Sequence, residues 1–197
     1  MTSIESTTEQ RPLTRTVDGA EVPAAGTYVL DGAHSHVGFS VRHLMVSKTK
    51  GRFADVAATV VIGEDPLESS VEVEIQVASV DTSDEARDGH LRSPDFLDAD
   101  AFPVLSYRST RVTPAGRGTW TVEGDLTVRG VTQPVPLEVT FEGGAHDPWG
   151  GSRIGFTARA ELDREAFGLT WNQALETGGV LVGKQVRIEI EAEAVQQ

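Results

Sequence analysis

The chain has 197 residues, of which 39% are hydrophobic and 24% are charged, and this composition is typical of one globular domain. Its 30 acidic residues outnumber its 17 basic residues, and the formal net charge of −13 disfavours binding to nucleic acids and electrostatic docking on anionic lipid. The absence of cysteine excludes disulfides, thiolate metal sites and a cysteine nucleophile. No apolar run approaches the roughly 20 residues that a membrane-spanning helix needs.

The first 24 residues differ in composition from the rest of the chain. They are rich in threonine, glutamate and serine and contain Pro12 and Pro23, so they cannot bury enough apolar surface to become ordered. We therefore predict a disordered leader over residues 1–24 and a single domain over residues 25–197. The leader has no basic segment followed by an apolar one, which predicts no signal peptide and a cytoplasmic location, or an exported one if the chain is truncated.

Alternation of apolar and polar residues dominates the rest of the chain. Val71, Val73 and Ile75 alternate with Glu72 and Glu74, and this period of two places one set on each face of a strand. One face is then dry and the other wet, as in antiparallel sheets. The same alternation runs through residues 120–129, 135–142, 153–162 and 186–194, and further strands are expected at 27–31, 35–43, 52–62 and 104–112.

These segments amount to about eight or nine strands joined by short glycine-rich turns. Their outer faces are strongly charged, so a second layer cannot cover them. A sheet of this size with one dry face must close on itself or fold over. We predict an all-β fold, a single antiparallel barrel of about eight strands, with a β-sandwich as the alternative.

Residues 82–98 interrupt the strand pattern. Ser83 followed by two acidic residues, and Ser93 followed by Pro94, are typical helix starts. We predict two short inserted helices here. The apolar Phe96 and Leu97 are expected to pack, with Phe102, over one mouth of the barrel.

The predicted barrel interior is lined mostly by valine, alanine, isoleucine and leucine, since aromatic residues make up only 6% of the chain. Barrels of about eight strands either pack solid or hold one small ligand, and composition leaves both possibilities open. If the lumen is open, the inward residues form a wall for an apolar tail, with Phe96, Leu97 and Phe102 near its mouth. The predicted wall consists of Phe39, Val41, His43, Val73, Ile75, Tyr107, Val122, Phe141, Phe156 and Ala158.

The histidines are candidates for metal binding or for polar contact with a ligand. His34 and His36 lie two residues apart, so on a strand they would share a face and could both reach a metal, but no third ligand stands beside them. We predict no metal site. His43 has the inward parity of its strand and either bonds to backbone or contacts the head group of a ligand. His90 is expected to face solvent.

Four segments, in order, resemble the YceI-like family: TYVLDGAHSHVGFSVRHLMVSKTKGRF, the helical insertion with its following strand, GDLTVRGVTQPVPLEV, and the C-terminal pair GFTARAELDREAFGLTWN and GGVLVGKQVRIEIEAEA. The resemblance covers about residues 25–195. It implies a lipocalin-like barrel that binds long amphiphiles, such as polyisoprenoids, isoprenoid quinones or fatty-acid derivatives, and it implies a homodimer. Beyond such a bound lipid, no cofactor is implied. Asp163-Arg164 with Phe167-Gly168 matches the family pattern, and we interpret this turn and Arg129 as structural.

Two classes of function follow. The first is a protein that carries, stores or sequesters an amphiphilic lipid, with no catalytic residue. The second is an enzyme acting on a lipid-like substrate in the same lumen, with His43 or the His34/His36 pair as acid–base or metal groups. The sequence contains no nucleophile elbow, phosphate loop, zincin motif or EF-hand, which favours the first class. A scaffold with an incidental lumen, which would show no ligand selectivity, is a third possibility.

Overall fold

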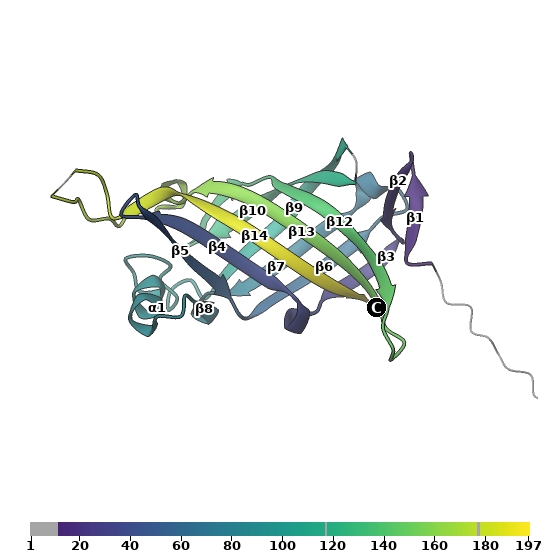
Figure 1. Ribbon diagram of the computed structural model, residues 1–197, viewed down its shortest axis with the longest axis horizontal. Helices are drawn as coiled ribbons and strands as arrows, with labels where there is room; N and C mark the ends of the chain where they lie inside the picture. Colours follow the sequence, from purple (N-terminus) through teal and green to yellow (C-terminus); the bar gives the residue numbers. More distant parts are fainter. Residues whose placement is uncertain (1–11, 117, 177) are drawn as a thin grey trace, which may run out of the picture.

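The computed structural model describes residues 12–116, 118–176 and 178–197. They form a closed barrel of eight long antiparallel strands, each paired with its neighbour in the chain (Figure 1). The predicted barrel is therefore confirmed, and the sandwich is not what forms. Five of the eight are continuous or nearly so: β9 (Val104–Gly116), β10 (Thr119–Val128), β12 (Leu137–His146), β13 (Ser152–Asp163) and β14 (Val182–Gln196).

The other three long strands are each broken into two pieces. The pieces are β3 (Gly26–Leu30) with β4 (His36–His43), β5 (Ser47–Phe53) with β6 (Val56–Ile62), and β7 (Ser70–Gln76) with β8 (Val80–Asp81). A short 3-10 turn separates β3 from β4 and another separates β7 from β8. Two residues separate β5 from β6, so the predicted strand 52–62 is bent between Phe53 and Val56.

Strand β14 closes the barrel. One of its edges pairs with β13 along almost its whole length, and its other edge pairs first with β4 and then with β3. A short strand, β11 (Val131–Pro134), folds back on β10 at one end of the barrel. Because every strand edge in the ring is paired, the dry faces turn inward and the charged faces turn to solvent.

The insertion before β9 contains one helix, α1 (Glu85–Arg92), at the end of the barrel shown on the left of Figure 1. Its N-cap is Asp84, whose carboxylate accepts from the Arg87 N–H, because Ser83 adopts a left-handed backbone conformation (φ 62°) instead of capping. The second predicted helix is wrong. Ser93 ends α1, and its hydroxyl donates to the His90 carbonyl, so residues 94–97 form turns only. Among the described residues, no helix is long and apolar enough to span a membrane.

The N-terminal hairpin is a second correction. Residues 1–11 lie outside the described part of the chain, but residues 14–23, predicted to be disordered, form an antiparallel hairpin of β1 (Thr14–Val17) and β2 (Ala20–Pro23). Val22 is 1% exposed and Leu13 is 7% exposed, because both pack on the end of the barrel opposite α1. The Arg15 guanidinium donates to the carbonyls of Gly63 and Glu64 in the β6–β7 connection. Tertiary contacts thus order a segment whose composition predicts disorder.

Deleting residues 1–24 is therefore expected to destabilise the barrel. Burial of two aliphatic side chains, less the entropy of ordering the hairpin, corresponds to about 2 kcal/mol of unfolding free energy, or a melting temperature lower by roughly 4–8 °C. Differential scanning calorimetry of the full and shortened chains measures the effect. As a matched pair, Val22→Ala should reproduce much of the loss, whereas Glu21→Ala, at an exposed neighbouring position, should not. An unchanged melting temperature after the deletion would contradict the packing role.

Two groups of buried residues lie toward the two ends of the barrel. One contains Tyr28, Ile62, Ile154 and Ala194 at the hairpin end, and the other surrounds Tyr107 and Phe167 at the α1 end. Gly124 is required in the second group, because a Cβ at this position would lie 2.4 Å from the Tyr107 ring. This absence of a side chain lets the tyrosine lie flat inside the wall of β10.

Candidate ligand-binding cavity

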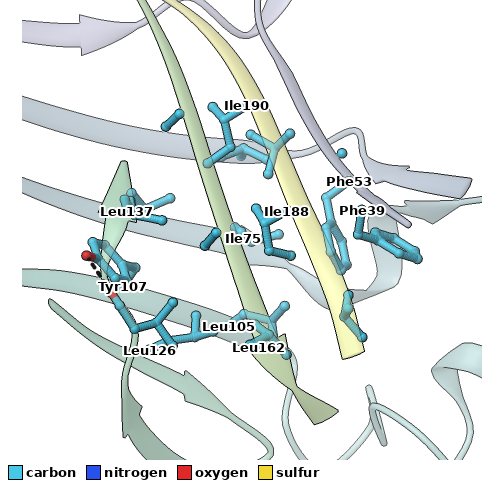
Figure 2. Close-up of a pocket in the computed structure, with 18 of the residues that line it drawn as sticks. Phe39, Phe53, Ile75, Leu105, Tyr107, Leu126, Leu137, Leu162, Ile188 and Ile190 are labelled. Carbon is cyan, nitrogen blue, oxygen red and sulfur yellow. Dashed lines mark hydrogen bonds between the residues drawn. The ribbon is translucent and has the colours of Figure 1, made fainter. Parts of the chain in front are cut away.

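The barrel lumen is open. A cavity of about 500 Å³ lies inside it, within the range of roughly 300–1,000 Å³ that natural ligand sites occupy. All eight long strands contribute apolar side chains to its wall, as Figure 2 shows for Phe39, Ile75, Leu137, Ile188 and others. Of the two possibilities that composition left open, the solid core is not the one found.

Strand parity placed the wall residues correctly. The inward residues lie on the cavity wall, and Phe96 and Leu97 line it at the α1 end. Their contact with a ligand stays a prediction. The strand residues so placed are Phe39, Val41, His43, Val73, Ile75, Tyr107, Val122, Phe141, Phe156 and Ala158.

Phe102 does not line the cavity, which corrects its predicted place at the mouth. Its ring lies over Gly130 in the β10–β11 turn, about 3.0 Å from where a glycine Cβ would be. Its backbone N–H donates to the Asp98 carbonyl, within the turn that follows α1.

Several wall residues were not predicted. Ile188 and Ile190 on β14 have the same alternation as the predicted residues, so the sequence signal for them was present. Phe53 ends β5 at the bend before β6, where the alternation is interrupted, so the period of two did not identify it as a wall residue. Trp171 lies in the irregular segment between β13 and β14, where no period exists, so only the folded chain brings it to the mouth.

Tyr107 is a buried polar group of the wall, and its hydrogen bonds are satisfied. Its hydroxyl donates to either of two carbonyls, those of Val122 at 3.0 Å and Val135 at 3.1 Å (Figure 2 shows the hydroxyl). Burial raises the pKa of this phenol, and the nearby Asp125 and Glu123 carboxylates raise it further. The group therefore remains protonated and serves the wall rather than proton transfer.

The ionisable groups of the cavity wall are basic or neutral. Although the chain is strongly acidic, no described aspartate or glutamate lines the cavity, and the ionisable residues that do are Arg42, His43, Arg87, His90, Arg164 and Tyr107. Except for Tyr107, all of these come from the strand ends, helix and loops of the α1 end. The polar end of the cavity thus offers hydrogen-bond donors and positive charge.

The two buried or half-buried arginines that line the cavity are already engaged by the protein. Arg164 is 3% exposed and donates to the carbonyls of Leu169, Trp171 and Gly183, and burial lowers its pKa. Arg87 donates to both oxygens of Thr82. His43 differs, because its ring makes no hydrogen bond to another described residue. It is a half-buried polar group at the mouth that is left to a ligand.

His90 also lies at the mouth, where it lines the cavity while its side chain stays 39% exposed, so its predicted exposure to solvent holds only in part. Its ring meets the Trp171 ring edge-on at 4.7 Å and the Phe96 ring at 5.0 Å, and its Nε2 is 3.0 Å from an Asp95 carboxylate oxygen. The three rings form a cluster beside the opening. The structural role predicted for Arg129 fits its contact here, since its guanidinium donates to the Phe96 carbonyl at 3.0 Å.

The His34/His36 pair does not form as predicted. His34 lies in the 3-10 turn before β4 and His36 is on the outer face of β4, so neither lines the lumen, which is where the enzyme hypothesis places this pair. His34 instead lies beside Asp31 and Glu193, a possible three-ligand group on the barrel exterior. The Arg153 guanidinium contacts Asp31 at 2.6 Å and also pairs with Glu193, and it holds the pKa of Asp31 far below its usual range. Both carboxylates of this group are thus already paired with an arginine.

A closed eight-stranded antiparallel barrel with an apolar lumen defines a lipocalin-like ligand-binding architecture. The chain belongs to the YceI-like family, since the model of the YceI-like domain matches residues 28–194. A UPF0312 protein of Staphylococcus aureus (strain N315) is 39% identical over 169 residues, which cover 84% of this chain and 95% of the relative. The hairpin of β1 and β2 precedes the matched domain.

Solved structures share the fold. The Campylobacter jejuni YceI protein is 29% identical with a TM-score of 0.67 and covers 85% of this chain and 96% of its own. BcnA of Burkholderia cenocepacia has a TM-score of 0.73 at 24% identity, covering 83% and 98%. A domain of Saccharophagus degradans, described as polyisoprenoid binding, has a TM-score of 0.64 at 13% identity, covering 88% and 100%. The last two establish likeness of fold alone.

Proposed function

We propose that this protein binds a long amphiphilic lipid in its lumen and thereby carries, stores or sequesters it. The ligand classes considered are polyisoprenoids, isoprenoid quinones and fatty-acid derivatives. The observation that carries the proposal is the apolar cavity of about 500 Å³, lined along all eight strands and without a described carboxylate. The polyisoprenoid-binding description of the Saccharophagus degradans domain, which has the same fold, supports it.

The wall supplies affinity without specific polar contacts. Each methylene moved from water into an apolar site contributes roughly 0.8 kcal/mol. A tail of several isoprene units therefore exceeds the association cost of roughly 4–15 kcal/mol. The tail needs only length and apolar character, which matches a wall made of valine, isoleucine, leucine and phenylalanine.

The polar head of the ligand is assigned to the α1 end. Arg42 is exposed and lines the cavity there, so the cavity reaches the surface, whereas the buried Val22 and Pro23 cover part of the opposite end. His43 on β4 and Thr49 on the neighbouring strand β5 both point into the lumen at this opening. A head group that accepts hydrogen bonds, such as a quinone carbonyl or a carboxylate, fits these donors.

Catalysis is the alternative, and His43 is the residue on which it now depends. We propose binding without catalysis and without a further cofactor, because the buried or half-buried lining arginines and Tyr107 are engaged by the protein and the other lining histidine, His90, is paired with Asp95. Turnover of a candidate lipid that vanished in His43→Ala would favour the enzyme. A homodimer and a cytoplasmic location stay predictions.

Organic extraction of the purified full chain, followed by mass spectrometry, tests the proposal. The expected result is a long-chain isoprenoid or acyl lipid in near-stoichiometric amount, and rebinding of such a lipid by the extracted protein. An extract free of lipid, together with no binding of a long-chain quinone to the extracted protein, would overturn it. Binding of unrelated small apolar compounds with equal affinity would favour the incidental lumen.

A further inference from the structure

The turn between β4 and β5 exposes three consecutive large apolar side chains. Leu44, Met45 and Val46 are 40%, 60% and 80% exposed, and we call these three the apolar tip. The Leu44 N–H donates to the Leu181 carbonyl at 2.9 Å, which places the tip beside the loop that carries the exposed Val180. Contiguous apolar surface of this kind marks an interaction site more often than chance exposure.

The backbone of the turn does not require these residues. The Val46 N–H donates to the His43 carbonyl, and Leu44 and Met45 have φ values of 53° and 61°, as in a type I′ hairpin turn. Such turns favour Asn-Gly, because bulky side chains are disfavoured at positive φ. The sequence therefore places apolar groups at the tip against local conformational preference.

Positive charge surrounds the tip. Residues 42–52 contain four of the 17 basic residues of the chain and none of its 30 acidic residues. On the outer face of the hairpin, Arg42 lies directly opposite Lys48, a like-charge pair that weakens the sheet, and Lys50 follows on the same face. Among the described residues, no carboxylate forms a salt bridge with any of these three, which we call the cationic strip. Arg52 instead pairs with Asp81.

The tip and the strip lie at the mouth of the cavity. Strands β4 and β5 also present Val41, His43 and Thr49 to the lumen, so one hairpin forms both the wall and the exposed edge. The neighbouring Leu181 and Val182 line the cavity as well. A tail that leaves the lumen at this end emerges next to the apolar tip.

We propose that the β4–β5 hairpin docks the barrel mouth on an anionic lipid bilayer. The apolar tip enters the interfacial region, and the cationic strip lies against the anionic head groups. The role that we assign to docking, which is passage of a lipid between bilayer and lumen, rests on the proposed function. Docking itself needs no ligand in the lumen.

The net charge of −13, which taken alone disfavours docking on anionic lipid, does not prevent docking through a local cationic surface. Charges interact over about 10 Å at moderate salt, so a bilayer senses the strip and the groups beside it more strongly than the acidic strands farther along the barrel. A second copy of the chain is the competing occupant. A two-fold contact through the same hairpin would set the cationic strip of one copy against that of the other, which disfavours it.

Flotation of the full chain with vesicles tests the proposal. We expect binding to vesicles of mixed phosphatidylcholine and phosphatidylglycerol, weak or no binding to pure phosphatidylcholine, and loss of binding as salt rises. Since each surface cation contributes about five-fold to partitioning, Lys48→Glu with Lys50→Glu should lower it at least about 25-fold. Met45→Ser with Val46→Ser should lower it about ten-fold or more.

Each variant has a matched control elsewhere on the barrel. Arg108→Glu with Arg111→Glu changes the net charge equally on β9, and Trp149→Ser removes an 88% exposed apolar side chain at the opposite end. Both controls should bind like the unaltered chain. None of the altered residues lines the cavity, so every variant should keep its extractable lipid.

Three outcomes overturn the proposal. The first is no binding of the unaltered chain to anionic vesicles. The second is equal loss of binding in the control variants. The third is a change from dimer to monomer in the tip variants, measured by light scattering, without vesicle binding, because the hairpin would then join two copies. If lipid remains in the lumen in any of these cases, only the docking proposal fails, whereas an empty lumen with intact docking rejects the proposed function alone.

Discussion

Replacing Ala158 by tryptophan is expected to abolish lipid binding while the barrel still folds. Ala158 is 7% exposed, lines the cavity and lies between Val139 on β12 and Ile190 on β14. An indole ring at this position projects into open lumen and occupies the path of an apolar tail. Because the ring fills empty space, the cost in unfolding free energy should stay below the roughly 1–3 kcal/mol typical of an overpacked core.

Arg159→Trp is the matched control for this variant. The same ring then stands one residue away, on the outer face of the same strand, where Arg159 is exposed. Titration with a long-chain quinone should show binding in this control and none in Ala158→Trp, and thermal melts should show both folded. A strongly destabilised Ala158→Trp protein, from an unaltered chain that extracts free of lipid, would contradict an open binding lumen.

Replacing Arg164 by methionine is expected to destabilise the protein by about 3 kcal/mol or more, since each buried acceptor left unpaired costs roughly 1–3 kcal/mol. Arg164 is almost fully buried and donates to backbone carbonyls on both sides of the loop between β13 and β14, among them Trp171 at 3.0 Å and Gly183 at 2.9 Å. Methionine keeps the apolar stem but removes every donor. The loss should also loosen Trp171 and thereby the aromatic cluster at the mouth.

Arg187→Met separates this effect from the mere loss of an arginine. Arg187 is exposed and makes a surface salt bridge with Glu161, so its loss should cost about 1 kcal/mol or less. Urea denaturation of both variants measures the two free energies of unfolding. Equal costs would mean that the carbonyls around Arg164 find water instead, and that the arginine does not hold the loop.

The alternation of the strands was enough to predict the barrel and most of its wall. Phe156 and Ala158 could be assigned to the lumen because a period of two depends only on strand geometry and not on what the strand packs against. The charged alternate faces then left closure as a way to bury the apolar ones. The family motifs added the expected ligand class, and the match over residues 28–194 confirms the family.

Local signals failed where tertiary contacts compete with them. Ser83 has the side chain of a helix cap, yet the cap is Asp84, because the entry into α1 turns Ser83 to positive φ. The spacing of His34 and His36 suggested that both lie on one strand. His34 instead lies in the 3-10 turn that separates β3 from β4, and β14 pairs with both of these strands. Trp171 reaches the mouth only because the buried Arg164 holds its loop.

Periodicity along the chain therefore determined the fold class, the inner and outer faces, and the apolar character of the lumen, since each depends on spacing between near neighbours. Packing between distant segments determined the rest. It ordered the hairpin of residues 14–23 on the barrel end, placed the Phe102 ring over Gly130, and brought His43, His90 and Trp171 to one mouth. These features depend on contacts between segments far apart in the sequence, and the spacing of residues within one segment cannot predict such contacts.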